Sequence, residues 1–288
     1  MKKTGHTTPM QTFLRTFFSR GIIIKVSLVI VIIFLIGALF APVISRYDPD
    51  KIDLHSTFLT ASKEHWLGTD AQGRDVFTRV LYGARISLLA SVFSCMLAAV
   101  LGMLLGLLAG YYEKTVATII LRYIDIQLSI PPLLFTIIIG MLVGHSLGGL
   151  IVAIAFGLIP GFTRMMYGLV LQVKGSDYIV ALRLAKIPAW KIILKHLLPN
   201  CFPSMIVMFA TNLGSAIMLE STLSFLGIGI QLPTASWGNM VSDGYKYIFT
   251  SPLLSLTPGI CITLTVVAFN ILGDGLRDAL DPRLRGKL

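Results

Sequence analysis

The sequence predicts an all-α integral membrane protein with six transmembrane helices and with both chain ends in the cytoplasm. Hydrophobic residues make up 55% of the 288 and charged residues only 13%, with a mean hydropathy of +0.81, which leaves too little polar surface for a soluble fold. The apolar residues form runs long enough to cross a bilayer, and the basic residues gather on one side of those runs. We therefore expect the membrane to surround most of the chain.

The spans can be counted from the long uncharged runs, because crossing a hydrocarbon core of about 30 Å takes roughly 20 helical residues. Five runs qualify: one between positions 25 and 46, and those at 86–112, 126–163, 201–219 and 247–273. The third run holds 38 residues and would be about 57 Å long as one helix. We expect it to fold back at the turn-forming residues 144–149, which gives six spans.

The first span could instead be a cleavable signal peptide, because basic residues precede it. Its apolar stretch is longer than the core of a signal peptide, however, and no small-x-small cleavage site closes it. We expect an uncleaved anchor. The basic residues before it are Lys2, Lys3, Arg15, Arg20 and Lys25.

Orientation follows from the basic residues, since an even number of spans puts both ends on one side. If that side is the cytoplasm, only seven of the 24 lysines and arginines remain outside, and six of those seven lie at 46–85 beside six acids. This outer loop is a weak exception, and the positive-inside rule still predicts an N-in, C-in topology. Because the basic residues are spread through loops, the net charge of +10 indicates cytoplasmic membrane loops and not a nucleic-acid surface.

The sequence carries no signature of an enzyme or of a bound cofactor. It contains neither a phosphate-binding G-x-x-x-x-G-K-S/T loop nor an H-E-x-x-H, G-x-S-x-G or dinucleotide motif, so we expect any ATP hydrolysis to come from another chain. Its five histidines are scattered at spacings that do not suit metal ligands, so we expect no metal centre. Three unpaired cysteines lie in apolar surroundings and are expected to act as small hydrophobes: Cys95, Cys201 and Cys261.

One face of the second span lacks side-chain bulk, because Gly102, Gly106 and Gly110 follow one another at steps of four. Small residues at this spacing allow two helix backbones to approach closely. The partner could be a gate helix or a companion subunit, or it could be an ordinary neighbour within this chain.

The segment 164–200 is too polar to span the membrane, yet it has helical character. Ser176 and Asp177 can cap a short helix over 178–186, Pro188 should interrupt it, and Pro199 should end a second run over 189–198. The first helix has an apolar stripe, which could dock on a partner protein or lie on lipid headgroups with its lysines reaching the phosphates. The stripe consists of Tyr178, Ala181, Leu182 and Ala185.

Glu220 ends the fourth apolar run. An ionisable group at membrane depth usually faces a cavity or a partner, so a place at a gate or along a solute path is one hypothesis. A role at the helix end, anchoring the following loop, is the other.

Four segments resemble the permease subunits of the dipeptide, oligopeptide and nickel ABC importers, and specifically the C-type member of each permease pair. Together with the spans they cover nearly the whole chain, in the expected order. They are HWLGTD at 65–70 with GRD at 73–75 and LYGARISL at 81–88; the cytoplasmic segment 177–200; ESTLSFLG at 220–227 with SWGN at 236–239; and AFNILGDGLRDALDPR at 268–283.

The resemblance implies a multi-pass subunit of the bacterial inner membrane, with the ABC importer permease fold, in which residues 1–85 precede a five-helix core at 86–288. Its implied partners are a homologous second permease, two ATPase subunits that use ATP and Mg, an extracytoplasmic solute-binding protein and membrane lipid. Transport would proceed by alternating access. The loop at about 164–200 would couple to the ATPases through Asp177, Tyr178, Ala181, Leu182, Arg183 and Lys186.

This coupling loop departs from the family pattern. Where relatives show Glu-Ala-Ala and then Gly, the chain has Val180-Ala181-Leu182 and then Lys186, which removes a carboxylate and makes a tight turn costlier. The resemblance leaves several solutes open: dipeptides, longer peptides, glutathione, nickel chelates and metallophores.

Two other classes of function have weaker support from the sequence. An ion-coupled secondary transporter should have acids in the middle of its spans, whereas Asp125, Glu220 and Asp274 all lie near span ends. A membrane-embedded enzyme would need a convergent set of catalytic groups, which the sequence lacks.

Overall fold

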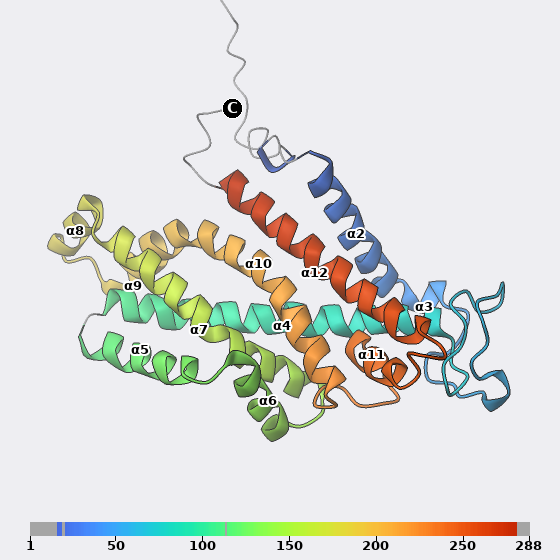
Figure 1. Cartoon of the computed structure of the whole chain (residues 1–288). Helices are drawn as coiled ribbons and strands as arrows, with labels where there is room; N and C mark the ends of the chain where they lie inside the picture. Colours follow the sequence, from blue (N-terminus) through green and yellow to red (C-terminus); the bar gives the residue numbers. More distant parts are fainter. Residues whose placement is uncertain (1–15, 19–20, 113, 281–288) are drawn as a thin grey trace, which may run out of the picture.

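The computed structural model describes residues 16–18, 21–112 and 114–280, and the regular structure in these residues is helical (Figure 1). Five helices are long and apolar enough to cross a membrane: α2 (Ile22–Leu39), α4 (Val76–Tyr111), α7 (Leu147–Lys174), the helical stretch Ala189–Phe225, and α12 (Leu253–Leu280). The shorter elements are α3 (Ala41–Ile44), η2 (Leu54–Ser56), α8 (Asp177–Leu184) and α11 (Trp237–Tyr245).

The sixth crossing is a broken helix. We expected one helix from residue 126 to the turn at 144, but α5 (Thr115–Leu128) and α6 (Pro132–Val143) meet at an angle of 94°. Pro131 and Pro132 lie at the break, and because proline lacks an N–H and restricts the residue before it, a straight helix cannot pass this point. The helix α5 begins at Thr115, eleven residues before the predicted start of this run at 126.

The helix expected to end at Pro199 continues instead. The stretch Ala189–Phe225 consists of α9 (Ala189–Ile192), the π-helical turn η3 (Ile193–Leu197) and α10 (Leu198–Phe225). Pro199 lies in the first turn of α10, where the missing N–H does not disturb the π-type hydrogen bonding before it. The cytoplasmic segment is therefore joined to the fourth long helix without an intervening loop.

Helices α4 and α7 form the closest pair, and the three glycines of α4 make this possible. A Cβ added at Gly102, Gly106 or Gly110 would overlap the Cβ of Phe162, Met166 or Val170 on α7, respectively. The glycine face thus packs within the chain, against its own α7. Phe162, Met166 and Val170 are fully buried in the main core cluster.

The outer loop and the coupling segment lie at opposite ends of the molecule (Figure 1). The loop ends earlier than expected, at Asp75, whose carboxylate caps α4 by accepting a hydrogen bond from the Thr78 N–H at 2.8 Å. The boundary expected after residue 85 therefore falls inside a continuous helix. Within the loop, hydrogen bonds from the Ser56 hydroxyl and the His55 N–H lower the pKa of Asp53.

Candidate functional site

A hollow of about 560 Å³ opens between the bent helix pair and the long helices α7, α10 and α12. Its wall on α7 is made of small residues and proline, including Gly157, Pro160 and Gly161, whereas Asn212, Ser215 and Asn270 supply polar groups from α10 and α12. A concave surface with polar groups at membrane depth is suited to a polar solute, because such groups would be costly against lipid tails. This hollow is the candidate solute path.

An ion pair lies on the same helices. The guanidinium Nη2 of Arg164 on α7 is 2.6 Å from the carboxylate Oδ1 of Asp125 on α5, and about half of each side chain is exposed. Arg164 was expected to begin the cytoplasmic segment, but α7 continues to Lys174. Because a charged pair on a bundle surface must be covered by water or by a polar partner, this surface is unsuited to lipid.

Glu220 lies outside the hollow and is fully buried. Its carboxylate accepts hydrogen bonds from the hydroxyls of Ser224, at 2.9 Å, and Ser221, at 3.3 Å. Ser87 of α4 and Ser236 before α11 lie around the same carboxylate. Glu220 therefore lies where α10, α4 and the start of α11 meet.

The same place is fixed by Trp237, whose side chain is fully buried. Its backbone N–H donates to the Ser87 hydroxyl at 3.2 Å, and its indole Nε1 donates to the Val80 carbonyl at 3.1 Å. Ser236 and Asn239 form a capping box that begins α11. Of the two hypotheses for Glu220, the geometry favours the loop anchor.

The helix α8, which was expected to couple to an ATPase, differs in detail from the predicted one. It begins at Asp177 and ends at Leu184, and the Ser176 hydroxyl donates to the Val173 carbonyl at 2.6 Å instead of capping the helix. Ile179 is buried against the rest of the chain. Most of the stripe faces outward, with Tyr178, Ala181 and Ala185 exposed and Leu182 half-buried.

Arg183 and Lys186 occupy particular positions in this segment. The Arg183 guanidinium lies 5.0 Å from the centre of the Tyr111 ring, at the end of α4, which turns it toward its own chain. Lys186 has a φ of 54°, a left-handed conformation that favours glycine. The lysine thus stands at the turn where the resemblance led us to expect glycine, and the turn forms despite the side chain.

Three features were missed by the sequence interpretation. The break at Pro131 has a signal, the Pro-Pro pair, that could have predicted it. The other two features depend on helix packing between distant segments, which no local pattern records. Asn212 and Asn270 line one hollow, and Asp125 pairs with Arg164.

Comparisons with known proteins agree with this arrangement. Residues 102–286 match the family described as binding-protein-dependent transport system inner membrane component, and residues 8–61 match the N-terminal TM domain of oligopeptide transport permease C. The solved structure of the MetNI methionine ABC transporter, in inward-facing conformations, aligns with a TM-score of 0.58 at 18% identity, over 70% of this chain and 96% of that chain. At that identity the likeness supports the fold alone.

Curated relatives cover almost all of the chain. A probable D,D-dipeptide transport system permease of Escherichia coli is 40% identical, over 91% of this chain and 88% of the relative. A glutathione transport system permease of Pectobacterium atrosepticum is 38% identical, over 96% and 92%. A dipeptide transport system permease of Alkalihalophilus pseudofirmus is 39% identical, over 90% and 86%.

Proposed function

The chain belongs to the family of binding-protein-dependent transport system inner membrane components, and we propose that it forms half of the solute path of an ABC importer for short peptides or a peptide-like solute. Membership makes it a multi-pass permease of the bacterial inner membrane. The observation that carries the peptide class is the extent of the likeness to dipeptide and glutathione permeases, which spans more than nine-tenths of the chain. Nickel and metallophore solutes, and an ion-coupled mechanism, are not favoured by these relatives.

The candidate solute path supports a polar cargo of this size. A volume of about 560 Å³ in one subunit, widened by a second permease opposite it, is enough for a short peptide. Asn212, Ser215 and Asn270 offer both donors and acceptors to a peptide backbone. These amides and hydroxyls carry no net charge, which suits a cargo whose side chains vary.

The remaining parts of the importer are supplied by other chains. Family membership implies an ATPase partner, and we propose two such subunits using ATP and Mg, a homologous permease and an extracytoplasmic binding protein. The exposed stripe of α8 would receive the ATPase, with Asp177, Tyr178, Ala181, Leu182, Arg183 and Lys186 as the coupling residues. Movement of α8 would then switch the path between the two sides of the membrane.

Uptake of a labelled dipeptide by cells with and without the gene for this chain tests the function. We expect uptake to require the chain, to stop when ATP is depleted, and to survive collapse of the proton gradient while ATP is maintained. Competition by unlabelled tripeptide and by glutathione would then rank the solutes. Uptake that follows the ion gradient, or that is unchanged without the chain, would overturn the proposal.

A further inference from the structure

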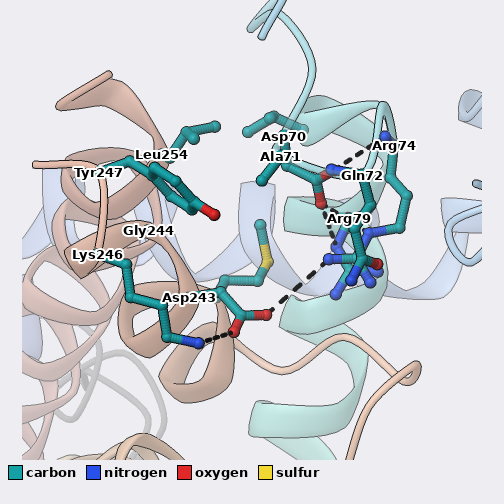
Figure 2. A pocket seen from close by; sticks show the side chains of 12 residues that line it. Asp70, Ala71, Gln72, Arg74, Arg79, Asp243, Gly244, Lys246, Tyr247 and Leu254 are labelled. Atoms are coloured by element: carbon teal, nitrogen blue, oxygen red, sulfur yellow. Dashed lines mark hydrogen bonds and ion pairs between the residues drawn. The ribbon is translucent and has the colours of Figure 1, made fainter. Parts of the chain in front are cut away.

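A second hollow, of about 110 Å³, lies at the outer end of the molecule, between the loop before α4 and the helix α11 (Figure 2). We call it the outer pocket. Its charged lining consists of Asp70, Arg74, Arg79, Asp243 and Lys246, and Gln72 and Tyr247 add uncharged polar groups. It is separate from the candidate solute path, which is lined by other residues.

Asp70 is the acid nearest Arg74 and Arg79, and its carboxylate already accepts hydrogen bonds from its own loop. The Oδ1 atom of Asp70 accepts hydrogen bonds from the backbone N–H groups of Gln72, at 2.8 Å, and Arg74, at 3.0 Å. Its Oδ2 atom accepts from the Arg74 Nε at 2.7 Å. Arg79 Nε is 3.7 Å from that oxygen, too far for a hydrogen bond. Asp70 therefore shapes the loop and leaves Arg79 incompletely paired.

Arg79 is buried with an unsatisfied nitrogen. Its side chain is 2% exposed, and Nη1 donates to the carbonyls of Pro49, at 2.8 Å, and Pro233, at 3.2 Å. Within the described part of the chain, its Nη2 has no hydrogen-bond partner. Asp50, 3.5 Å from Nη1, is the other nearby acid. A buried guanidinium nitrogen without an acceptor is costly, so the site favours an incoming acceptor.

The other charges at the pocket are also loosely paired. Arg74, 4% exposed, has its Nη2 3.9 Å from the Oδ2 of Asp243, while the Oδ1 of Asp243 is 3.4 Å from the Lys246 Nζ. In Figure 2 the contact between Asp243 and Arg74 crosses the pocket from α11 to the loop, whereas Lys246 lies on the same side as Asp243. Three cations and two acids line the pocket, and Asp50, 3.5 Å from Arg79 Nη1, is a third acid beside it. The long distances within these pairs leave the guanidinium groups able to bind a further anion.

We propose that the outer pocket receives a carboxylate side chain of the extracytoplasmic solute-binding protein when that protein docks, an inference that rests on the proposed function. A carboxylate matches the planar guanidinium groups and fits the volume with its last methylene. The carboxylate comes from a docking protein because the pocket lies at the end of the molecule opposite α8, and Lys246 at its edge is 66% exposed. Docking there would engage α11, whose Gly238 packs directly against Ser221 and Ser224 of α10.

Ala71 lines the pocket and allows a matched test. Ala71→Glu places a carboxylate in the pocket from the chain itself, whereas Ala71→Gln adds the same bulk without charge. In the complete transporter in lipid nanodiscs, we expect Ala71→Glu to raise the melting temperature and to weaken docking of the peptide-loaded binding protein at least about tenfold. Ala71→Gln should do neither to the same extent.

A second arm separates a bound side chain from a small free anion. Acetate replacing chloride at equal ionic strength should weaken docking to the wild-type transporter and leave the residual docking of Ala71→Glu unchanged. Two outcomes would overturn the carboxylate site while leaving the importer intact. In one, Ala71→Glu docks the binding protein as well as the wild type does; in the other, Ala71→Glu and Ala71→Gln lose docking equally. Stabilisation by acetate without any change in docking would make the pocket a small-anion site and would equally overturn the proposal. A wild-type transporter that docks no binding protein would overturn the proposed function itself.

Discussion

The side-chain amide of Asn200 donates a hydrogen bond to the hydroxyl of Tyr178 at 3.1 Å, and this bond joins the first turn of α8 to the first turn of α10. Asn200 also donates to the His196 carbonyl at 2.7 Å, within the helical stretch that precedes it. The two ends of the coupling segment are thus fastened to each other. A movement of α8 would therefore pull on α10 through this hydrogen bond.

Replacing Ala181 with arginine should abolish uptake while membrane insertion stays normal. Ala181 is exposed on α8, and an arginine there would bring bulk and an unpaired charge into the proposed ATPase contact, at a cost of about 3–5 kcal/mol if it is fully buried. Co-purification of the ATPases and ATP-dependent uptake are the measurements, and Ala181→Ser, which adds little volume, is the control. An Ala181→Arg protein that still co-purifies and still couples hydrolysis to uptake would contradict docking at this helix.

Replacing Lys186 with glycine should stabilise the coupling loop or leave it unchanged. The φ of 54° costs a lysine about 1 kcal/mol, which offsets the greater freedom of glycine in the unfolded chain. Hydrogen exchange of the α8 amides measures the effect. Lys191→Gly is the control, because Lys191 lies in α9 with helical geometry, where glycine should cost about 1 kcal/mol. Equal loss of protection in the two variants would show that the turn does not matter.

Glu220→Gln should retain much of the uptake, whereas Glu220→Ala should unfold readily. Glutamine keeps the shape and an oxygen acceptor for the serine hydroxyls, but alanine leaves buried hydroxyls unpaired and a cavity, at about 2–5 kcal/mol. Uptake and thermal melting should be measured together. Loss of uptake in the glutamine variant, with a shifted pH optimum, would instead indicate proton coupling.

Gly106→Ala should lower the melting temperature. A Cβ at this position would lie 2.6 Å from the Met166 Cβ and from the Thr163 carbonyl oxygen, so α4 and α7 would have to separate. Gly168→Ala is the matched control, since its Cβ would meet nothing within 4 Å. That variant should be neutral or gain up to about 1 kcal/mol. Similar melting of the two variants would exclude close packing as the role of Gly106.

The outer loop should be accessible from outside the cell. Single cysteines at Lys51 or Lys63, both exposed, in a background without the native three, should react with an impermeant thiol reagent on intact cells. A cysteine at Lys191, exposed at the other end, should react only after lysis. The reverse pattern would invert the topology.

The spans were predictable because their signal is local: length and hydropathy decide whether a segment can lie in a bilayer. The break before Pro132 was missed since hydropathy does not distinguish a straight helix from a broken one. The continuation through Pro199 was missed for a related reason. The π-helical turn before it lets the helix continue past the proline, and composition does not predict such a turn. The family and fold, implied by long ordered motifs, were confirmed.

The candidate sites were only partly predictable. The exposed stripe at Tyr178 and Ala181 follows from helical spacing alone. By contrast, the surroundings of Glu220 depend on tertiary contacts, such as the hydrogen bond between Trp237 and Ser87, which are 150 residues apart. The outer pocket combines Asp70 and Arg74 of the loop and Arg79 of α4 with Asp243 of the distant helix α11, so the sequence shows each half without the other.

The unbroken helical stretch Ala189–Phe225 has a mechanical consequence. Its 37 residues are about 55 Å long, more than the thickness of the hydrocarbon core. A body of that length that tilts by about 10° around its midpoint moves each end by about 5 Å, in opposite directions. Near its outer end, Ser221 and Ser224 pack directly against Gly238 of α11, so a tilt that moves the inner end one way moves α11, at the rim of the outer pocket, the other way. The continuous helix thereby connects the two faces of the membrane, and its π-helical turn and Pro203 are the places where it can bend.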